Sequence, residues 1–224
     1  MAKITVLGRR NSNNVIPVMW TIDELGLDYE RKNYGGTFGG TSDPEYRAIN
    51  PNGTIPAIVD NGFPLYESNA IVRYLCMNYD NKVLMPKTKQ EFAIADQWME
   101  WYKATLYHVF HPWFWSIART KQAEQDPAKT RELKNKLDRL LLILDHHLSR
   151  NEYITGNSFS MGDIPLGVAI NRYFTLNEEE QNLAALRRWR DLLATRAAFK
   201  KHVDFPFGRS FEEFARLERD GAAG

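Results

Sequence analysis

The chain has 224 residues, of which 43% are hydrophobic and 12% aromatic, enough for one large domain or two small ones with a buried core. Lys and Arg (29) nearly balance Asp and Glu (28), which argues against nucleic acid or an anionic membrane as the partner. A single cysteine, Cys76, excludes an internal disulfide and a metal site built from several thiolates. No apolar run approaches the ~18 residues of a membrane span, so we expect a cytoplasmic protein that binds a small molecule.

The first third of the chain alternates between strand and helix patterns. Residues 4–7 predict a strand, and residues 14–25 predict a helix that Gly26 ends by adopting a positive φ. Residues 28–33 predict a second strand. The glycine-rich segment 35–40 fits neither regular element and predicts a mobile loop over the site.

The pattern continues with a short helix at residues 44–50. Residues 55–59 and 63–66 predict two strands, and the Asn-Gly pair between them is a strong hairpin signal. Ser68 stands where an N-cap is expected, ahead of a third helix that runs to about residue 79. The predicted order of elements is therefore βαβαββα.

Beyond residue 86 the strand signals almost vanish and long amphipathic stretches follow, which predicts an all-helical second part. His111-Pro112 should kink or interrupt the first of these stretches, because proline removes a backbone donor. Ser160 and Asp163 have the spacing of a capping-box variant at a helix start. The four stretches span residues 92–119, 128–148, 161–174 and 183–199.

The most informative motif is Asn-Pro-Asn-Gly-Thr-Ile-Pro-Ala-Ile-Val-Asp at residues 50–60, followed by Leu-Tyr-Glu-Ser-Asn-Ala-Ile at residues 65–71. In order and spacing it resembles the glutathione site of the cytosolic glutathione S-transferases, of the bacterial theta-like or nu-like kind. The resemblance implies a thioredoxin-like, glutathione-binding domain at residues 1–80. It also implies an all-helical domain with a hydrophobic substrate pocket at residues 87–224, and a homodimer.

Four residues of this motif are implicated in binding glutathione. The resemblance implies a cis bond between Ile55 and Pro56, which would turn the backbone of Ile55 outward to pair with the cysteinyl unit as an added strand does. Ser68 at a helix N-terminus is suited to the α-carboxylate of the γ-glutamyl unit, and Glu67 to its ammonium group. The alternative is that Ser68 only caps its helix and Glu67 only complements the helix dipole.

Two residues near the first predicted helix are candidates for contact with the glutathione sulfur. By resemblance, Ser12 lies where theta-like and delta-like members carry serine, and Asn14 where the bacterial disulfide-reducing members carry asparagine. A hydroxyl donor together with the positive end of a helix would stabilise the thiolate. Either residue could instead serve only as a helix cap. One departure is Gly53, where relatives often carry histidine or lysine, so the glycyl carboxylate is expected to be held differently or weakly.

Four other features of the sequence bear on its chemistry. Aromatic residues crowd residues 98–115, and Trp113 is the candidate for a hydrophobic pocket that holds the second substrate. Cys76 lies on an apolar helix face and is expected to be a buried, inert thiol. The five histidines have no metal-like spacing, so we expect no metal. The basic stretch 187–201 is expected to be a solvated helix face rather than a nucleic-acid surface.

Three functions remain open from the sequence. The first is a transferase that stabilises the glutathione thiolate through Ser12 and conjugates it to an electrophilic small molecule. The second is a glutathione-dependent disulfide reductase assisted by Asn14, in which glutathione supplies the sulfur atoms. The third is a non-catalytic protein that keeps the fold and binds a partner, to which the departure at Gly53 would be suited.

Overall fold

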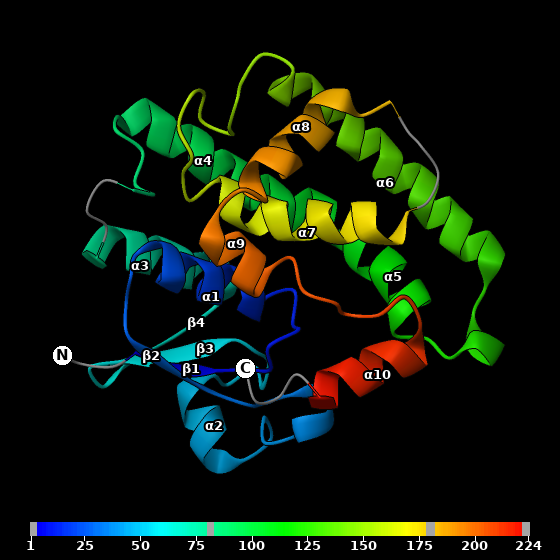
Figure 1. The fold of residues 1–224 in the computed structure, drawn as a ribbon. Coiled ribbons are helices and arrows are strands. Elements are labelled where there is room, and N and C mark those ends of the chain that lie inside the picture. The colour runs from blue at the N-terminus through cyan, green and yellow to red at the C-terminus, as the bar shows by residue number, and fades with distance from the viewer. Residues whose placement is uncertain (1–3, 80–82, 178–181, 221–224) are drawn as a thin grey trace.

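The computed structural model describes residues 4–79, 83–177 and 182–220. Figure 1 shows a small sheet with its helices at one end of the molecule and a larger group of helices at the other end. The N-terminal elements are β1 (Ile4–Leu7), α1 (Val15–Glu24), β2 (Tyr29–Lys32), η1 (Gly36–Phe38), α2 (Pro44–Ile49), β3 (Ala57–Asp60), β4 (Phe63–Tyr66) and α3 (Ser68–Tyr79).

The sheet has the strand order β2-β1-β3-β4, with β1 and β2 parallel and the other neighbours antiparallel. Successive side chains of a strand point to opposite faces, and β1 shows this clearly. Val6 packs in a cluster with residues of α1 and α3, whereas Leu7 packs with Tyr46 of α2. Figure 1 shows α1 and α3 on one side of the sheet and α2 on the other. The predicted order βαβαββα is confirmed, and the arrangement is thioredoxin-like.

Backbone conformation confirms two turn predictions and corrects a third. Gly26 follows α1 with φ 64°, and Asn61 and Gly62 have φ 51° and 84°, as a type I′ hairpin turn requires. The helix α3, however, begins at Ser68 itself, and Glu67 precedes it with φ 70°. Ser68 is therefore the first helical residue rather than the N-cap.

The glycine-rich segment 35–40 is more regular than predicted. Its centre forms η1, a single 3₁₀ turn closed by a hydrogen bond of 3.4 Å from the N–H of Gly39 to the carbonyl of Gly36. Gly35, Gly36, Gly39 and Gly40 all have positive φ, which lets the chain turn tightly on either side of η1. The glycines therefore allow a compact turn in this segment.

The rest of the described chain is helical, as predicted, apart from an isolated bridge between Tyr153 and Gly156. None of the helices within the described residues combines the length and apolar character needed to cross a bilayer. The elements are α4 (Lys89–Trp101), η2 (Tyr102–Leu106), α5 (Tyr107–Ala118), η3 (Gln122–Glu124), α6 (Pro127–Leu148), α7 (Asp163–Leu176), α8 (Ala184–Leu193), α9 (Ala197–His202) and α10 (Phe211–Asp220).

Two helix predictions need correction. Pro112 does not interrupt the first long stretch, because it lies inside α5, which continues to Ala118. The irregularity comes earlier, at η2, a π-helical turn closed by the bond from the N–H of Tyr107 to the carbonyl of Tyr102. The helix α10 was not predicted at all. It buries Phe214 and Glu218, and Figure 1 shows it next to η1 and the end of α5.

The two parts of the chain share a core. Trp20 of α1 is fully buried, and its ring lies 5.7 Å from that of Phe159 and 5.1 Å from that of Phe199 in α9. Cys76 is buried in the same cluster, as predicted for an inert thiol. An ion pair of 2.7 Å between Arg196 and Glu24 also joins the two parts. This packing holds the second half of α1 against the helices.

Asp163 bonds back to Ser160 at the start of α7, as predicted, but the N-cap of this helix is Gly162 rather than Ser160. Asp163 Oδ2 accepts hydrogen bonds from the backbone N–H and the hydroxyl of Ser160, at 2.9 and 3.2 Å. Its Oδ1 accepts from the backbone N–H of Ile154 at 3.0 Å and from the indole N–H of Trp189 at 2.8 Å. Burial raises the pKa of Asp163 to about 6, against the opposing effect of these hydrogen bonds. The residue anchors the core of the helical part.

Candidate functional site

Two adjoining hollows open where the sheet meets the helices. We call the larger one, of about 350 Å³, the main cleft, and the smaller one, of about 210 Å³, the side pocket. Asn14, Thr54, Ile55 and Tyr107 line both of them. A single elongated ligand could therefore extend from one into the other.

The side pocket lies between the start of α3 and the segment before β3. Ser68 is 2% exposed there, and the N–H groups in the first turn of a helix lack partners within the helix. Glu67 has a left-handed conformation that costs a non-glycine residue about 1–2 kcal/mol and recurs at ligand sites. The bond between Ile55 and Pro56 is cis, as expected. Within the described residues, the backbone N–H and carbonyl of Ile55 make no hydrogen bond.

The side pocket thus offers the features of a peptide-binding groove. Unpaired backbone groups at Ile55 can add an extended peptide as a strand would. The start of α3 then meets the end of that peptide with N–H groups and the Ser68 hydroxyl, which suits a carboxylate. The exposed side chain of Glu67 provides a nearby negative charge for an ammonium group.

Ser12 and Asn14 both line the main cleft at the start of α1, but their side chains are differently engaged. Oγ of Ser12 accepts a bond of 3.3 Å from the backbone N–H of Asn14, so the hydroxyl can still donate to another acceptor. Nδ2 of Asn14 donates to the hydroxyl of Tyr107 at 3.2 Å, and its Oδ1 accepts from Nζ of Lys103 at 3.0 Å. Ser12 has a free donor at the cleft, while Asn14 bridges the two parts of the chain.

Sequence reasoning missed both helical partners of Asn14. Burial lowers the pKa of Lys103, and nearby Glu67 acts in the opposite direction. Burial raises the pKa of the Tyr107 hydroxyl, which therefore stays protonated at neutral pH. Tyr107 places a second hydroxyl at the main cleft, which Ser12 also lines. Their position near η2, where the helix changes register, gave no local signal in the sequence.

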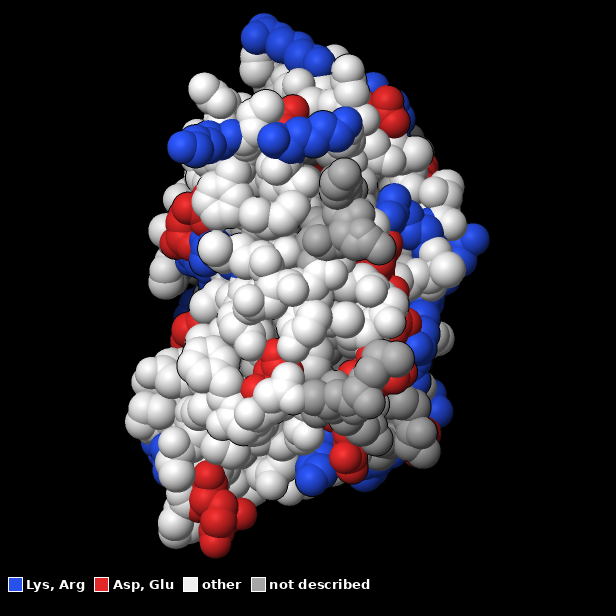
Figure 2. Space-filling model, turned by 90° about the vertical axis from the view of Figure 1, so that its left-hand side faces the viewer, with Lys and Arg blue, Asp and Glu red and all other residues white. Residues whose placement is uncertain are grey.

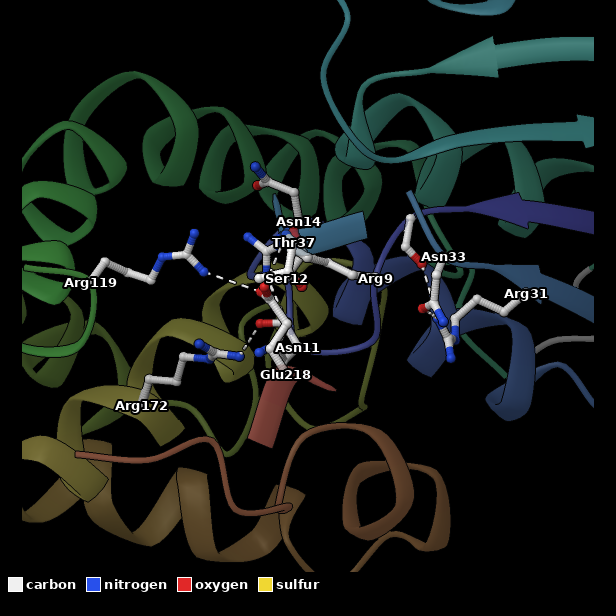
Figure 3. Close-up of polar contacts among 11 residues, drawn as sticks. Arg9, Asn11, Ser12, Asn14, Arg31, Asn33, Thr37, Arg119, Arg172 and Glu218 are labelled. Atoms are coloured by element: carbon white, nitrogen blue, oxygen red, sulfur yellow. Dashed lines mark hydrogen bonds and ion pairs between the residues drawn. The ribbon is translucent and has the colours of Figure 1, made fainter. Parts of the chain in front are cut away.

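Three arginines and one carboxylate meet at the far wall of the main cleft. Figure 3 shows Arg119, at the end of α5, Arg172 from α7 and Glu218 from α10 gathered around Arg9 and Asn11, which follow β1. Oε1 of Glu218 lies 3.0 Å from Nη1 of Arg9 and 3.2 Å from Nη1 of Arg119. Its Oε2 accepts from the backbone N–H of Thr37 in η1 at 3.2 Å. One buried carboxylate therefore connects α10 with the loop after β1, with η1 and with α5.

Arg172 is buried without an acidic partner. It is 2% exposed, and its Nη2 donates to the carbonyl of Asn11 at 2.7 Å. The guanidinium carbon also lies 4.9 Å from the ring centre of Phe114 and 4.4 Å from that of Phe207. Burial, together with the charge of Arg9, lowers the pKa of Arg172 to about 9. Arg172 therefore stays charged at neutral pH.

Aromatic rings form much of the rest of the main cleft. Trp115, His111, Phe114 and Phe214 line it. Burial and the positive charges of Lys103, Arg119 and Arg9 lower the pKa of His111 to about 4, so its ring is neutral at pH 7.

Trp113 was expected in this pocket, and the structure corrects that expectation. The side chain of Trp113 is 1% exposed and packs against Phe110 and Tyr173 on the opposite side of α5. Residues two positions apart on a helix point in nearly opposite directions, so Trp115 faces the cleft in its place.

Gly53, the departure from the family motif, also has a structural explanation. It has φ 63°, and a Cβ at this position would lie 2.6 Å from the guanidinium carbon of Arg47. A histidine or lysine would therefore be strained at position 53. The guanidinium of Arg47 in α2 occupies the space that such a side chain would enter.

Comparisons with known proteins agree with this geometry. Residues 2–76 match the family model of the glutathione S-transferase N-terminal domain, and residues 106–197 match that of the C-terminal domain. Glutathione S-transferase GstB of Escherichia coli is 35% identical over 205 residues, which cover 91% of this chain and 99% of that protein. Glutathione S-transferase 3 of Zea mays is 30% identical over 214 residues, 91% of this chain and 94% of that one.

Solved structures give the same result. A theta class glutathione S-transferase from Xanthomonas axonopodis pv. citri, with glutathione bound, has a TM-score of 0.89 and 40% identity, covering 93% of this chain and 100% of that one. The transferase URE2P6 of Phanerochaete chrysosporium, in complex with oxidized glutathione, has a TM-score of 0.80 and 27% identity, covering 96% and 98%. The expected resemblance is confirmed. This chain belongs to the glutathione S-transferase family and is an enzyme of that type.

Proposed function

We propose that the protein is a glutathione transferase, which binds glutathione in the side pocket and conjugates its sulfur to an electrophilic carbon in the main cleft. The observation that carries the proposal is the arrangement at Ile55, where unpaired backbone groups lie between Ser68 of the side pocket and Ser12 of the main cleft. Residues 1–80 would bind glutathione, and residues 87–224 would supply most of the pocket for the second substrate.

Each part of glutathione would have its own partner in the side pocket. The backbone of Ile55, next to Pro56, pairs with the cysteinyl unit in the manner of an added strand. Ser68 and the first turn of α3 receive the α-carboxylate of the γ-glutamyl unit, and Glu67 receives its ammonium group. These contacts place the sulfur at the junction of the two hollows, near Ser12.

Ser12 would then stabilise the thiolate. A thiol has a reference pKa near 8.5, so only a few per cent is ionised at neutral pH. The hydroxyl of Ser12 can donate to sulfur because its oxygen only accepts, from the N–H of Asn14. The start of α1 adds its positive end. The thiolate attacks the electrophilic carbon, a sulfur–carbon bond forms, and the leaving group departs with its electron pair.

Asn14 would be a positioning residue rather than the sulfur contact. Both ends of its amide are engaged, with the hydroxyl of Tyr107 and the ammonium group of Lys103. It thereby holds α1 against the helices on the other side of the groove. If Asn14 contacts sulfur instead, disulfide reduction becomes the better assignment.

We further propose a cytoplasmic homodimer that acts in detoxication. Figure 2 shows a face of the molecule that is largely uncharged, with Lys and Arg gathered mainly toward its rim. The structure also leaves large apolar side chains exposed at Phe63, Met77, Val83 and Ile94, by 49%, 66%, 41% and 38%. Exposed apolar residues in such number suit a protein interface.

The proposal is tested by assaying the purified full chain with glutathione in two formats. One follows conjugation of benzyl chloride, and the other follows reduction of a mixed disulfide between glutathione and 2-hydroxyethanethiol. Conjugation above the uncatalysed rate, with slower disulfide reduction, supports the transferase. Faster disulfide reduction favours the reductase. Activity in neither format, together with no binding of glutathione, would mean a non-catalytic protein that binds a partner.

A further inference from the structure

The described residues that line the main cleft carry more positive than negative charge. Three guanidinium groups, those of Arg9, Arg119 and Arg172, line the cleft, and no carboxylate residue is among its described lining residues. Glu218 behind the wall pairs with Arg9 and Arg119 through the same oxygen, Oε1. One negative charge thus serves two arginines, and the third has no acidic partner within the described residues.

Several buried donors at this wall have no acceptor. Nη1 of Arg172, Nε of Arg9 and Nδ2 of Asn11 are buried and make no hydrogen bond with any described residue. A buried donor without a partner is costly, and a buried charge more so. Arg172 lies at the cleft with its guanidinium unpaired on one side, so an anion in the cleft would satisfy both its charge and its donor.

We propose that the second substrate is an anion, a small electrophile that carries a carboxylate and is held by the guanidinium groups of Arg119 and Arg172. The inference rests on the proposed function, because it names the substrate class of the same site. A guanidinium presents several N–H groups in a plane and suits a carboxylate particularly well. The neutral ring of His111 and the indole of Trp115 provide apolar surface beside the two arginines.

The position of the arginines separates this site from that of glutathione. Arg119 directly follows α5 and Arg172 lies in α7, on the helical wall of the main cleft, as Figure 3 shows. Glutathione paired with Ile55 and anchored at Ser68 would lie along the opposite wall, which the sheet and α3 provide. An anion on the arginines would therefore be presented to the sulfur from the helical side.

The experiment compares an anionic electrophile, 4-(chloromethyl)benzoate, with its uncharged methyl ester, which is larger by one methyl group. In both, the glutathione thiolate attacks the benzylic carbon, the sulfur–carbon bond forms, and chloride leaves with the electron pair of the carbon–chlorine bond. For each compound, kcat/KM is divided by the uncatalysed rate constant. We expect this ratio to be at least about tenfold higher for the carboxylate, given what a hydrogen bond to a charged group contributes.

Two variants and a control locate the preference. Arg119→Gln and Arg172→Met should each lower the preference for the carboxylate about tenfold or more, because each removes a guanidinium from the proposed site. Arg139→Gln removes an exposed guanidinium on α6 and should keep the wild-type preference. If Arg172→Met fails to fold, Arg119→Gln alone decides the matter. Calorimetry with unreactive 4-methylbenzoate supplies a second readout, and we expect saturable binding that Arg119→Gln weakens.

The outcomes separate this inference from the proposed function. Equal ratios for the two electrophiles, in a protein that binds glutathione, overturn the anionic substrate and leave the transferase intact. An Arg119→Gln variant that loses glutathione affinity but keeps the preference assigns the arginine to glutathione and also overturns the inference. Absence of glutathione binding overturns the proposed function, and binding of 4-methylbenzoate then still decides whether the cleft holds an anion.

Discussion

The guanidinium of Arg9 and the carboxylate of Glu218 lie 3.0 Å apart and join the loop after β1 to α10, near the end of the described chain. Glu218 has a side chain only 2% exposed, and it also pairs with Arg119. The last helix therefore contributes to the wall of the main cleft. Its attachment uses one buried carboxylate, Glu218, together with the buried ring of Phe214.

Replacing that carboxylate should destabilise the protein. We expect Glu218→Ala to lower the free energy of unfolding by about 3 kcal/mol, because it leaves the partly buried guanidinium groups of Arg9 and Arg119 without their acidic partner. Urea denaturation followed by circular dichroism measures this. Glu212→Ala removes an exposed carboxylate of the same helix and should change stability by less than about 0.5 kcal/mol. Equal effects of the two variants would show that the buried ion pairs contribute nothing.

Removing the Ser12 hydroxyl should weaken thiolate stabilisation. A hydrogen bond to a charged group contributes about 1.5–3 kcal/mol, so Ser12→Ala should raise the pKa of bound glutathione by about one to two units. The rate at neutral pH should then fall about 10- to 100-fold. Absorbance of the thiolate near 240 nm as a function of pH measures the pKa directly.

The control for that experiment is Ser149→Ala, which removes an exposed hydroxyl after α6 and should leave the thiol pKa unchanged. Asn14→Ala serves as the comparison within the site. It should shift the thiol pKa less than Ser12→Ala, since its amide is bonded to Tyr107 and Lys103. A larger shift for Asn14→Ala would assign the sulfur contact to Asn14.

Asp163 should make stability depend on pH in a definite direction. Its pKa is raised from 3.8 to about 6 in the folded protein, because burial disfavours the charged form. Between these two values the folded state binds more protons than the unfolded state, so this group's contribution to stability falls as pH rises from about 4 to 6. The decrease should disappear in Asp163→Asn. We would measure denaturant midpoints across this range for both proteins, and parallel curves would contradict the assignment.

The proposed dimer face can be tested with a charge. Met77→Glu places a carboxylate at an apolar residue of α3 that is 66% exposed, and it should weaken association at least about 100-fold. Leu142→Glu on α6, where leucine is 55% exposed, is the matched control and should remain dimeric. Light scattering at micromolar concentration distinguishes a dimer from the chain mass of 26.0 kDa. A wild-type monomer would refute the dimer itself.

The sheet and its helices were predictable because local chemistry determines them. The Asn61-Gly62 turn, Gly26 after α1 and the motif at residues 50–60 each require particular backbone geometry, and the structure has that geometry. The cis bond before Pro56 followed only from the resemblance, because most such bonds are trans. The start of α3 differed by one residue, a common uncertainty at helix ends.

The arginine wall was not predictable, because it depends on which distant helices meet. Arg172 lies in a largely apolar helix, which was a visible signal, but no pattern showed that its neighbour in space would be Asn11. The prediction that Trp113 lines the pocket was wrong because this helix carries aromatic residues on several faces, and the sequence does not show which face is buried. The helix α10 was overlooked, although Phe211, Phe214 and Glu218 have helical spacing.

The central claim, that the groove beside Ile55 binds glutathione, is tested most directly by titration calorimetry of the full chain with reduced glutathione. The account predicts saturable binding of one glutathione per chain, weakened about tenfold or more by Ser68→Ala or Glu67→Ala, and unaffected by Ser149→Ala. Absence of binding at millimolar glutathione, or binding that neither variant at residues 67 and 68 weakens, would contradict it.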